Sequence, residues 1–170
     1  MESETADSRK RSTGNLFRIV TTAMFAVLLG LMFLDPRWFT SPTVTIYVPD
    51  DCRTCESYAH YLRSQGFWVV HGPAAELPAI QARLRLPPAF RCRHVAVVAG
   101  LMVAGHVPAK EIRSFIDPQK RGRTIGLVVP GLPEGAPGLE LFFTSHYSVF
   151  AVSKSGLITP VAFYHGDAFE

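Results

Sequence analysis

The 170-residue sequence has few of the features that mark several common protein classes. Three cysteines are too few for a small domain held together by disulfides. The formal net charge is only +3, which argues against a dedicated nucleic-acid-binding protein. The sequence has no Walker A loop and no G-x-G-x-x-G, G-x-S-x-G or H-E-x-x-H motif. With 48% hydrophobic residues, however, the chain is too apolar to be disordered, so a folded domain is expected.

The N-terminal part of the sequence predicts a membrane anchor. Residues 1–15 are polar, whereas residues 16–34 are nearly all apolar and carry no charge from Ile19 to Leu34. A membrane-spanning helix needs about 20 residues. The segment reaches this length if its ends, up to Phe39, lie at the interfaces and Arg18 extends toward the headgroups. A cleaved signal peptide is the alternative, but the sequence that follows, LDPRWFTSP, lacks small residues at the cleavage positions. We therefore expect a polar tail over 1–15 and an uncleaved transmembrane signal anchor over 16–39.

The basic residues around this segment predict its orientation. Only Arg37 follows the apolar run closely, whereas four basic residues precede it or lie at its start: Arg9, Lys10, Arg11 and Arg18. The positive-inside rule then places the N-terminus in the cytoplasm. We expect a single-pass protein of the bacterial inner membrane, in contact with the lipid bilayer, with residues 40–170 in the periplasm and no nucleic-acid partner.

The exterior part of the chain reads as one α/β domain. The expected strands are residues 43–48, 67–71, 94–99, 101–104, 146–152 and 157–164, and the expected helices are 56–65, 74–86 and 108–116. Residues 118–145, rich in glycine and proline, are expected to be mostly loop. The first two strands flank a helix and so require a parallel crossover, whereas later strands form hairpins. This order predicts a thioredoxin-like mixed sheet with flanking helices and a C-terminal β-hairpin, preceded by one transmembrane helix.

Cys52 and Cys55 form a C-x-x-C motif where the first strand leads into the first helix. A helix N-terminus favours the thiolate, which suits redox or metal chemistry. A redox dithiol, a pair of metal ligands and a structural disulfide all remain open, although a disulfide closing so short a loop adds little stability. A thioredoxin-type oxidoreductase would carry Trp, Gly or Pro between its cysteines and Pro before the third strand. This chain has Arg53–Thr54 and Arg93 there, so catalysis is not expected.

Cys92 and His94 lie at the start of the third strand, which faces the C-x-x-C loop in a thioredoxin-like fold. Together with Cys52 and Cys55 they form a candidate ligand set for Cu(I) or Zn(II). A buried, inert Cys92 is an equally good interpretation. His106, in a GHVP turn, is interpreted as a packing or capping residue.

Five segments resemble the domain-of-unknown-function family 411, small bacterial proteins usually found near copper and heavy-metal resistance genes. The segments are YLRSQGF at 61–67, LPAIQARLRLPP at 77–88, HVAVVAG at 94–100, AGHVPAKEI at 104–112 and GLVVPGLPEGAPGLE at 126–140. The resemblance covers nearly all of residues 43–165. It implies a thioredoxin-like fold outside the cytoplasm and a soft-metal site.

The chain departs from the family pattern at the positions expected to bind metal. The middle cysteine of the family's C-x-C-C is Thr54, and the cysteine before the family histidine is Arg93, with Cys92 displaced by one residue. The two methionines of the last motif are replaced by Leu132 and Leu139. A Met→Leu change keeps the volume and loses the sulfur. His94 and His106 remain, so the resemblance implies a degenerate metal site.

Lost ligands together with an added anchor favour a non-catalytic, cofactor-free accessory subunit of a bacterial membrane complex of respiratory or photosynthetic type. Such a subunit would contact integral-membrane proteins through residues 118–145 and the basic stretch 83–93. The alternative is a membrane-tethered periplasmic protein that binds copper or another soft metal through Cys52, Cys55, Cys92 and His94. A tethered thiol-disulfide oxidoreductase is the third hypothesis.

Overall fold

The computed structural model describes residues 18, 20–27, 41–139 and 145–165. The chain divides into two compact units, Met1–Thr40 and Ser41–Glu170. In the first, residues 18 and 20–27 are helical, and the hydroxyls of Thr21 and Thr22 donate hydrogen bonds to the Arg18 carbonyl oxygen. Most of the predicted anchor over 16–39, and the tail over 1–15, lie outside the described residues. Among the residues that are described, no helix has the length and apolar character of a membrane span.

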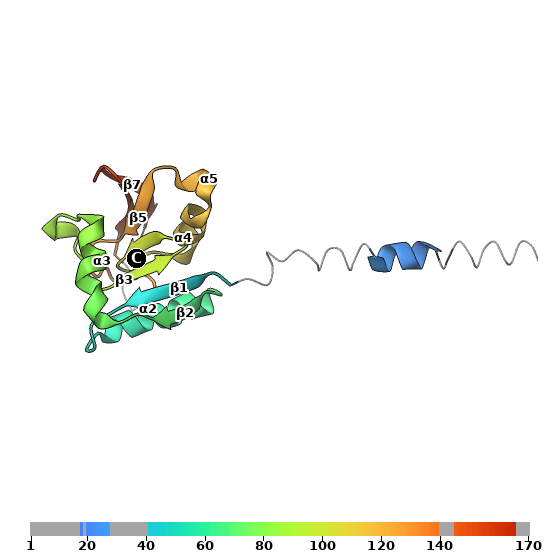
Figure 1. Ribbon diagram of the computed structural model, residues 1–170, viewed down its shortest axis with the longest axis horizontal. Helices are drawn as coiled ribbons and strands as arrows, with labels where there is room; N and C mark the ends of the chain where they lie inside the picture. The colour runs from blue at the N-terminus through green and yellow to red at the C-terminus, as the bar shows by residue number, and fades with distance from the viewer. Residues whose placement is uncertain (1–17, 19, 28–40, 140–144, 166–170) are drawn as a thin grey trace, which may run out of the picture. The chain divides into compact units, whose positions relative to one another are not determined.

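The second unit is built on a single seven-stranded mixed sheet (Figure 1). Its spatial order is β2-β1-β3-β4-β5-β6-β7. In chain order the strands are β1 (Thr43–Tyr47), β2 (Trp68–His71), β3 (Val95–Val98), β4 (Leu101–Ala104), β5 (Thr124–Val128), β6 (Tyr147–Ser153) and β7 (Ile158–Tyr164). The β1–β2 and β4–β5 pairs are parallel and the other pairs are antiparallel. The predicted mixed sheet with a C-terminal hairpin is therefore confirmed.

The helices connect these strands near the positions that the sequence predicts. They are α2 (Arg53–Ser64), α3 (Leu77–Leu84), α4 (Ala109–Ile116) and α5 (Pro118–Arg121), with short 3-10 turns at Ala74–Glu76 and Pro88–Phe90. The helix predicted over 74–86 is shorter than expected. Its first turn is 3-10, and it ends at Arg85, which adopts a left-handed conformation (φ 49°) shortly before Pro87.

The prediction of a loop over residues 118–145 is wrong for its first third, which holds α5 and the buried strand β5. Asp117 begins α5, because its carboxylate accepts a hydrogen bond from the Gln119 backbone N–H. Gly126 indicated a loop, yet it lies in the middle of β5. A Cβ atom there would lie 2.8 Å from the Met102 carbonyl oxygen and would also clash with the Leu84 side chain. The glycine thus lets β5 and α3 pack closely.

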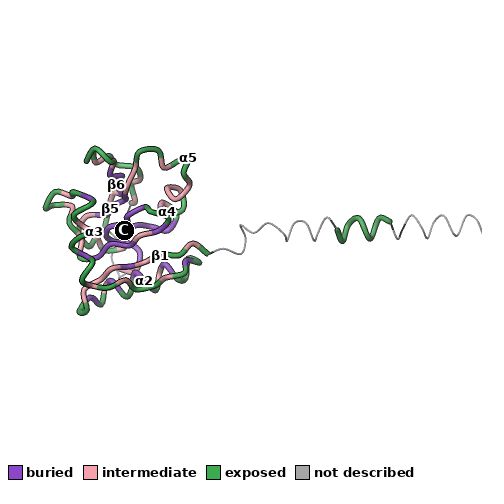
Figure 2. Tube along the Cα trace, in the orientation of Figure 1, coloured by how far each residue is buried: buried purple, intermediate pink, exposed green. Residues whose placement is uncertain are grey.

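Helices cover both faces of the sheet, and residues of the buried strands alternate between two cores. The central strands are the most continuously buried part of the domain (Figure 2). One core lies under α2 and α4 and takes Ala96 and Val98 of β3. The other lies under α3 and takes Val95 of the same strand. Successive strand residues point to opposite faces, so a strand buried on both sides is apolar throughout. This explains why HVAVVAGLMVA reads as a continuous apolar run.

Candidate metal-binding site

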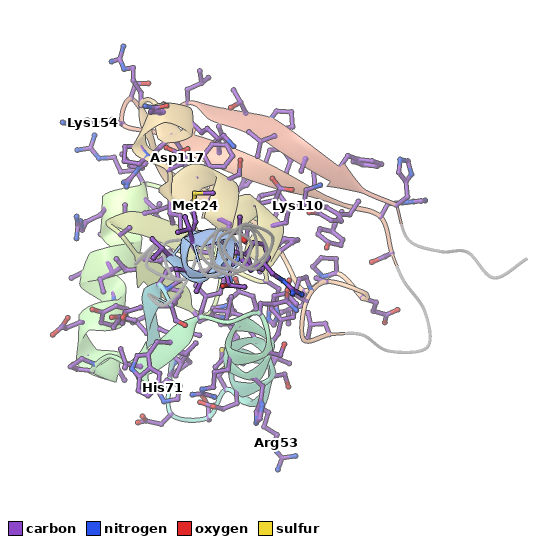
Figure 3. The ribbon with its side chains drawn as sticks, turned by 90° about the vertical axis from the view of Figure 1, so that its right-hand side faces the viewer. Met24, Arg53, His71, Lys110, Asp117 and Lys154 are labelled. Carbon is purple, nitrogen blue, oxygen red and sulfur yellow. A yellow bond between two sulfur atoms is a disulfide. The ribbon has the colours of Figure 1, made fainter. Side chains whose placement is uncertain are left out.

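Cys52 and Cys55 form a disulfide in this structure, with an S–S distance of 2.03 Å. Cys52 occupies the N-cap position of α2, and Cys55 lies in the first turn of that helix with no exposed surface. The chain turns between β1 and α2, where the Cys52 N–H donates a hydrogen bond to the Pro49 carbonyl oxygen. Arg53, between the cysteines, points away from the domain (Figure 3). Both cysteines are therefore buried, Cys55 completely and Cys52 with 7% of its surface exposed beside a surface pocket.

His94 lies against the inner sulfur of this disulfide. Its Nδ1 is 3.3 Å from Cys55 Sγ, and the residue is only 2% exposed. A disulfide sulfur has no hydrogen to donate, so this contact requires the proton on Nδ1 and leaves the lone pair on Nε2. His94 Nε2 is buried and makes no hydrogen bond to the described residues. Burial, and secondarily His106, lower the pKa of His94 to about 3, and a backbone interaction with Gly105 offsets only part of this shift, so the ring is neutral at physiological pH.

His106 is the second buried histidine, in the turn between β4 and α4. Its Nδ1 lies 2.8 Å from the carbonyl oxygen of Pro137. A carbonyl only accepts hydrogen bonds, so Nδ1 carries the proton and Nε2 is the basic nitrogen of the neutral ring. Histidines that bind metals usually donate their other ring N–H to a carbonyl or carboxylate in this way. The ring is thus oriented as a ligand would be, and it is also buried and packed, as expected of a packing residue.

The phenol ring of Tyr58 completes a group of three closely packed rings. Its centroid lies 5.2 Å from that of His94 and 5.0 Å from that of His106, and the two imidazole centroids are 5.0 Å apart. The Tyr58 hydroxyl donates a hydrogen bond to the Val107 carbonyl oxygen, and burial raises the pKa of Tyr58 well above its usual value. The phenol is therefore neutral, and its hydroxyl is already hydrogen-bonded. Its ring forms a wall of the site and restricts the motion of both histidines.

Cys92 does not lie with the other two cysteines. Its thiol donates to the Val129 carbonyl oxygen at 3.3 Å, and its side chain packs against the core beneath α3. Burial raises the pKa of Cys92 to about 12. The chain bends at Arg93, so Cys92 and His94 do not share a face as residues two apart in a straight strand would. The structure thus brings His94 to Cys55 but leaves Cys92 as a protonated thiol.

A pocket of about 280 Å³ nevertheless joins Cys92 to the two histidines. The other side chains along it include Thr54, Arg93 and Leu132, which stand where the family pattern has cysteine, cysteine and methionine. Three of the four substituted positions, all except Leu139, thus lie beside the retained histidines. In this oxidised state, no three His, Cys, Asp or Glu side chains of the described residues are arranged to hold a metal ion. A metal site here requires the two thiols of the opened disulfide.

The outer side of the disulfide is bordered by polar and charged residues. A second pocket next to Cys52 is lined by Asp50, Asp51 and Glu56. Arg93 pairs with Asp51 at 3.2 Å, and Glu56 pairs with His71 at 3.3 Å. These pairs are exposed and contribute little to stability. They give the approach to Cys52 a mixed charge, with carboxylates that attract cations.

The sequence predicted that Cys52, Cys55 and His94 belong to this cluster, and it gave His106 another role. The family motif AGHVP contained the signal, since His106 is retained there while sulfur ligands are lost. No sequence feature indicated Tyr58, because an aromatic residue at helical spacing usually packs in a core.

Comparison with known proteins identifies two kinds of relative. The model of a family described as "Protein of unknown function, DUF411" matches residues 90–139. Two solved structures of a copper resistance protein CopG also match, both with a TM-score of 0.67. Form 1 is 30% identical and covers 75% of this chain and 100% of its own, and Form 2 is 29% identical and covers 74% and 99%. The comparison with curated proteins gave no match.

Proposed function

This chain belongs to the DUF411 family, and from that membership we propose that it is a copper-handling protein of the bacterial periplasm. Its cargo is a soft metal ion, best Cu(I), held by Cys52, Cys55 and His94, with His106 as a further nitrogen donor. An external dithiol would first reduce the disulfide to two thiols and would itself be oxidised to a disulfide. Apart from His106, which takes the place of Cys92, this copper-binding role is the alternative that the sequence favours beside an accessory subunit. The similarity to a copper resistance protein supports it, whereas no comparison supports a subunit of a membrane complex.

The observation that carries the proposal is the position of His94. A buried polar atom without a hydrogen bond costs about 1–3 kcal/mol, so proteins rarely retain one without a use. His94 Nε2 is such an atom, and the other nitrogen of the same ring touches Cys55. Reduction of the disulfide would put two thiols beside this neutral imidazole. Thiolate sulfur is the donor that Cu(I) prefers, and imidazole is a common partner ligand.

Each residue of the cluster then has a separate task. Cys52 and Cys55 supply sulfur, and the N-terminus of α2 stabilises their thiolates. His94 supplies nitrogen, while the Pro137 carbonyl holds His106 in the tautomer that has a basic Nε2. Tyr58 packs against both imidazole rings and forms the inner wall of the site. The proposed role is binding and transfer of an ion, without catalytic turnover.

The substituted positions set the expected strength of the site. Thr54 and Leu132 line the pocket at places where the family pattern has sulfur. Fewer soft donors should give a weaker site with about one copper ion per chain. Cys92, held by the Val129 carbonyl, is not among the expected ligands.

We further propose a thioredoxin-like domain, tethered by residues 16–39, with its N-terminus in the cytoplasm. The sheet supports the first part, because β1, α2 and β2 form a parallel crossover and β3 and β4 follow as an antiparallel hairpin. The charge distribution around the apolar segment supports the second part. A tether would keep the domain close to the membrane across which ions are moved.

Metal binding by the purified full-length chain tests this function. We would reduce the protein under anaerobic conditions, add Cu(I), remove unbound ion and measure copper per chain. We expect about one copper in the wild type and in Cys92→Ser, and strong loss in Cys52→Ser/Cys55→Ser, because only the latter removes the sulfur donors. Oxidised wild-type protein should bind far less Cu(I).

Circular dichroism and thermal unfolding of each variant would show that the fold is intact. Two results would contradict the proposal. One is a reduced wild-type protein that retains no copper. The other is a folded Cys52→Ser/Cys55→Ser variant that retains as much copper as the wild type.

A further inference from the structure

A second group of aromatic and metal-binding side chains lies at the open end of the C-terminal hairpin. Strands β6 and β7 form one edge of the sheet, with Lys154 at their closed end (Figure 3). At the other end the ladder finishes with Tyr147 opposite Tyr164. His146 and His165 are the next residues outward on the two strands, so the register brings them face to face. Neither belongs to the cluster around Cys55.

The two imidazole rings are in contact. Their centroids are 5.4 Å apart and their planes are nearly perpendicular, at 85°. Phe163 supports both rings, since it stacks with His146 at 6.1 Å and meets the edge of His165 at 4.7 Å. Side chains two residues apart on a strand share a face, so Phe163 and His165 lie on the same side of the hairpin. His146 and His165 are both exposed.

The backbone around this pair is held in register from the opposite face. The rings of Tyr147 and Tyr164 stack at 4.9 Å, and the Tyr164 hydroxyl donates a hydrogen bond to Glu111 of α4. The Ser145 N–H donates to the Glu134 carbonyl oxygen at 2.8 Å, which fixes the residue before His146. The two histidines therefore extend from an ordered pair of strands, and little backbone entropy would be lost on binding a ligand.

The spacing fits two imidazoles on one metal ion. With metal–nitrogen distances of about 2.0–2.1 Å and angles between about 90° and 110°, two such rings have centroids about 4.5–5.2 Å apart. The observed separation of 5.4 Å is close to this range, and the perpendicular rings would turn about their side-chain bonds so that one nitrogen of each faces the ion. Two protein ligands leave the remaining coordination positions to water. Nitrogen donors of this kind favour Cu²⁺, and after it Zn²⁺ and Ni²⁺.

We propose that His146 and His165 form a surface site for a divalent metal ion, and that Cu²⁺ is the ion that binds most tightly. The site uses no sulfur and does not depend on the redox state of Cys52 and Cys55. It is therefore independent of the proposed function, and the protein has a nitrogen site for an oxidised ion on its surface in addition to any thiol site within.

Titration of the full-length, disulfide-intact protein with Cu²⁺ tests the site. Calorimetry and electron paramagnetic resonance are the two readouts of this titration. We expect a binding event with superhyperfine coupling to two imidazole nitrogens. His146→Ala and His165→Ala should each weaken that event by about tenfold or more, because one ligand is removed. His60→Ala, which removes an exposed histidine on α2, is the matched control and should leave it unchanged.

All three substitutions are at exposed positions, so the fold should persist, and thermal unfolding would verify this. The proposal is overturned if both hairpin variants bind Cu²⁺ as the wild type does, or if the spectrum shows a single nitrogen that persists in either variant. Failure of Cu(I) binding at the cysteines would not affect this result, because the titration uses the oxidised protein.

Discussion

His94 Nδ1 lies 3.3 Å from Cys55 Sγ, so a buried neutral imidazole contacts the inner sulfur of the C-x-x-C disulfide. The two residues are 39 positions apart in the chain, and they meet because β3 runs antiparallel beside β1. The contact joins the element that supplies sulfur to the element that supplies nitrogen. The first two predictions below follow from it.

Replacement of His94 by leucine should separate function from stability. The substitution removes a nitrogen donor, so Cu(I) binding by the reduced protein should fall about tenfold or more. It also removes a buried polar atom that has no hydrogen bond, and such an atom costs about 1–3 kcal/mol. The free energy of unfolding should therefore stay the same or rise, as urea denaturation would measure. A large loss of stability in His94→Leu would show instead that the imidazole is retained for packing.

Stability should depend on pH through the same residue. The folded-state pKa of His94 is about 3 and the unfolded-state value is about 6.5, so the unfolded chain binds more protons between these values. The contribution to stability is fully present above about pH 6.5 and is lost as pH falls toward 3, by up to about 1 kcal/mol per pH unit.

Because carboxylates also titrate in this range, the measurement is the difference between wild type and His94→Leu. Denaturation curves at several pH values should show a shallower decline in the variant. Parallel curves for the two proteins would contradict the assignment of a strongly lowered pKa to His94.

Gly138 should be required for the loop that orients His106. It has φ +78°, and a Cβ atom there would lie 2.9 Å from the backbone of Ser57 and Tyr58 in α2. Gly138→Ala should therefore cost about 1–3 kcal/mol and displace the neighbouring Pro137 carbonyl from His106. Gly156→Ala is the matched control, because its φ is +87° with no heavy atom within 4 Å of the added Cβ, and it does not line the pocket at the histidines.

Urea denaturation and Cu(I) affinity of the two glycine variants would separate backbone strain from the contact with α2. Both variants should lose some stability to backbone strain. Only Gly138→Ala should also push the loop away from α2, because its Cβ would clash with the α2 backbone. Equal losses in stability and equal copper affinity would show that the approach of this loop to α2 does not matter.

Restoring one sulfur should strengthen the site. Leu132 is 53% exposed and lines the pocket with His94 and His106, so a thioether there can reach the ion without repacking the core. We expect Leu132→Met to raise the affinity of the reduced protein for Cu(I) in a competition assay with a chromogenic chelator. Leu157→Met, at another exposed leucine, is the control and should have no effect. Equal affinity in Leu132→Met and the wild type would place the ion elsewhere.

The sequence predicted the sheet and most helices because their signals are local. The runs TVTIYV and HVAVVAGLMVA are β-branched and apolar, and a turn separates each from its neighbour. Strand β5 was missed for a non-local reason. Gly126 reads as a turn residue in the sequence, and only the position of α3 shows that a side chain cannot fit there. The length of α3 was overestimated, because the left-handed residue Arg85 ends it before Pro87.

The candidate site was predictable only in part. The C-x-x-C motif and the start of β3 follow from the fold pattern, so Cys55 and His94 could be placed together. Cys92 lies away from the other two cysteines because of a bend at Arg93, which local sequence propensities do not predict. The role of His106 depends on Pro137, 31 residues away, whose carbonyl selects the ring tautomer. Long-range partners of this kind are not visible in the spacing of single residues.

Strand β5 pairs with β4 in parallel, and such a pair forms only after the intervening crossover has closed. Val129, which contacts Cys92, follows directly after β5, and Pro137, which contacts His106, lies in the loop beyond it. The cysteines precede all of these elements in the chain. We therefore expect the thiols to be accessible during folding before the wall behind them is complete. The order in which the chain folds then gives an oxidant or a copper ion an interval in which to reach Cys52 and Cys55.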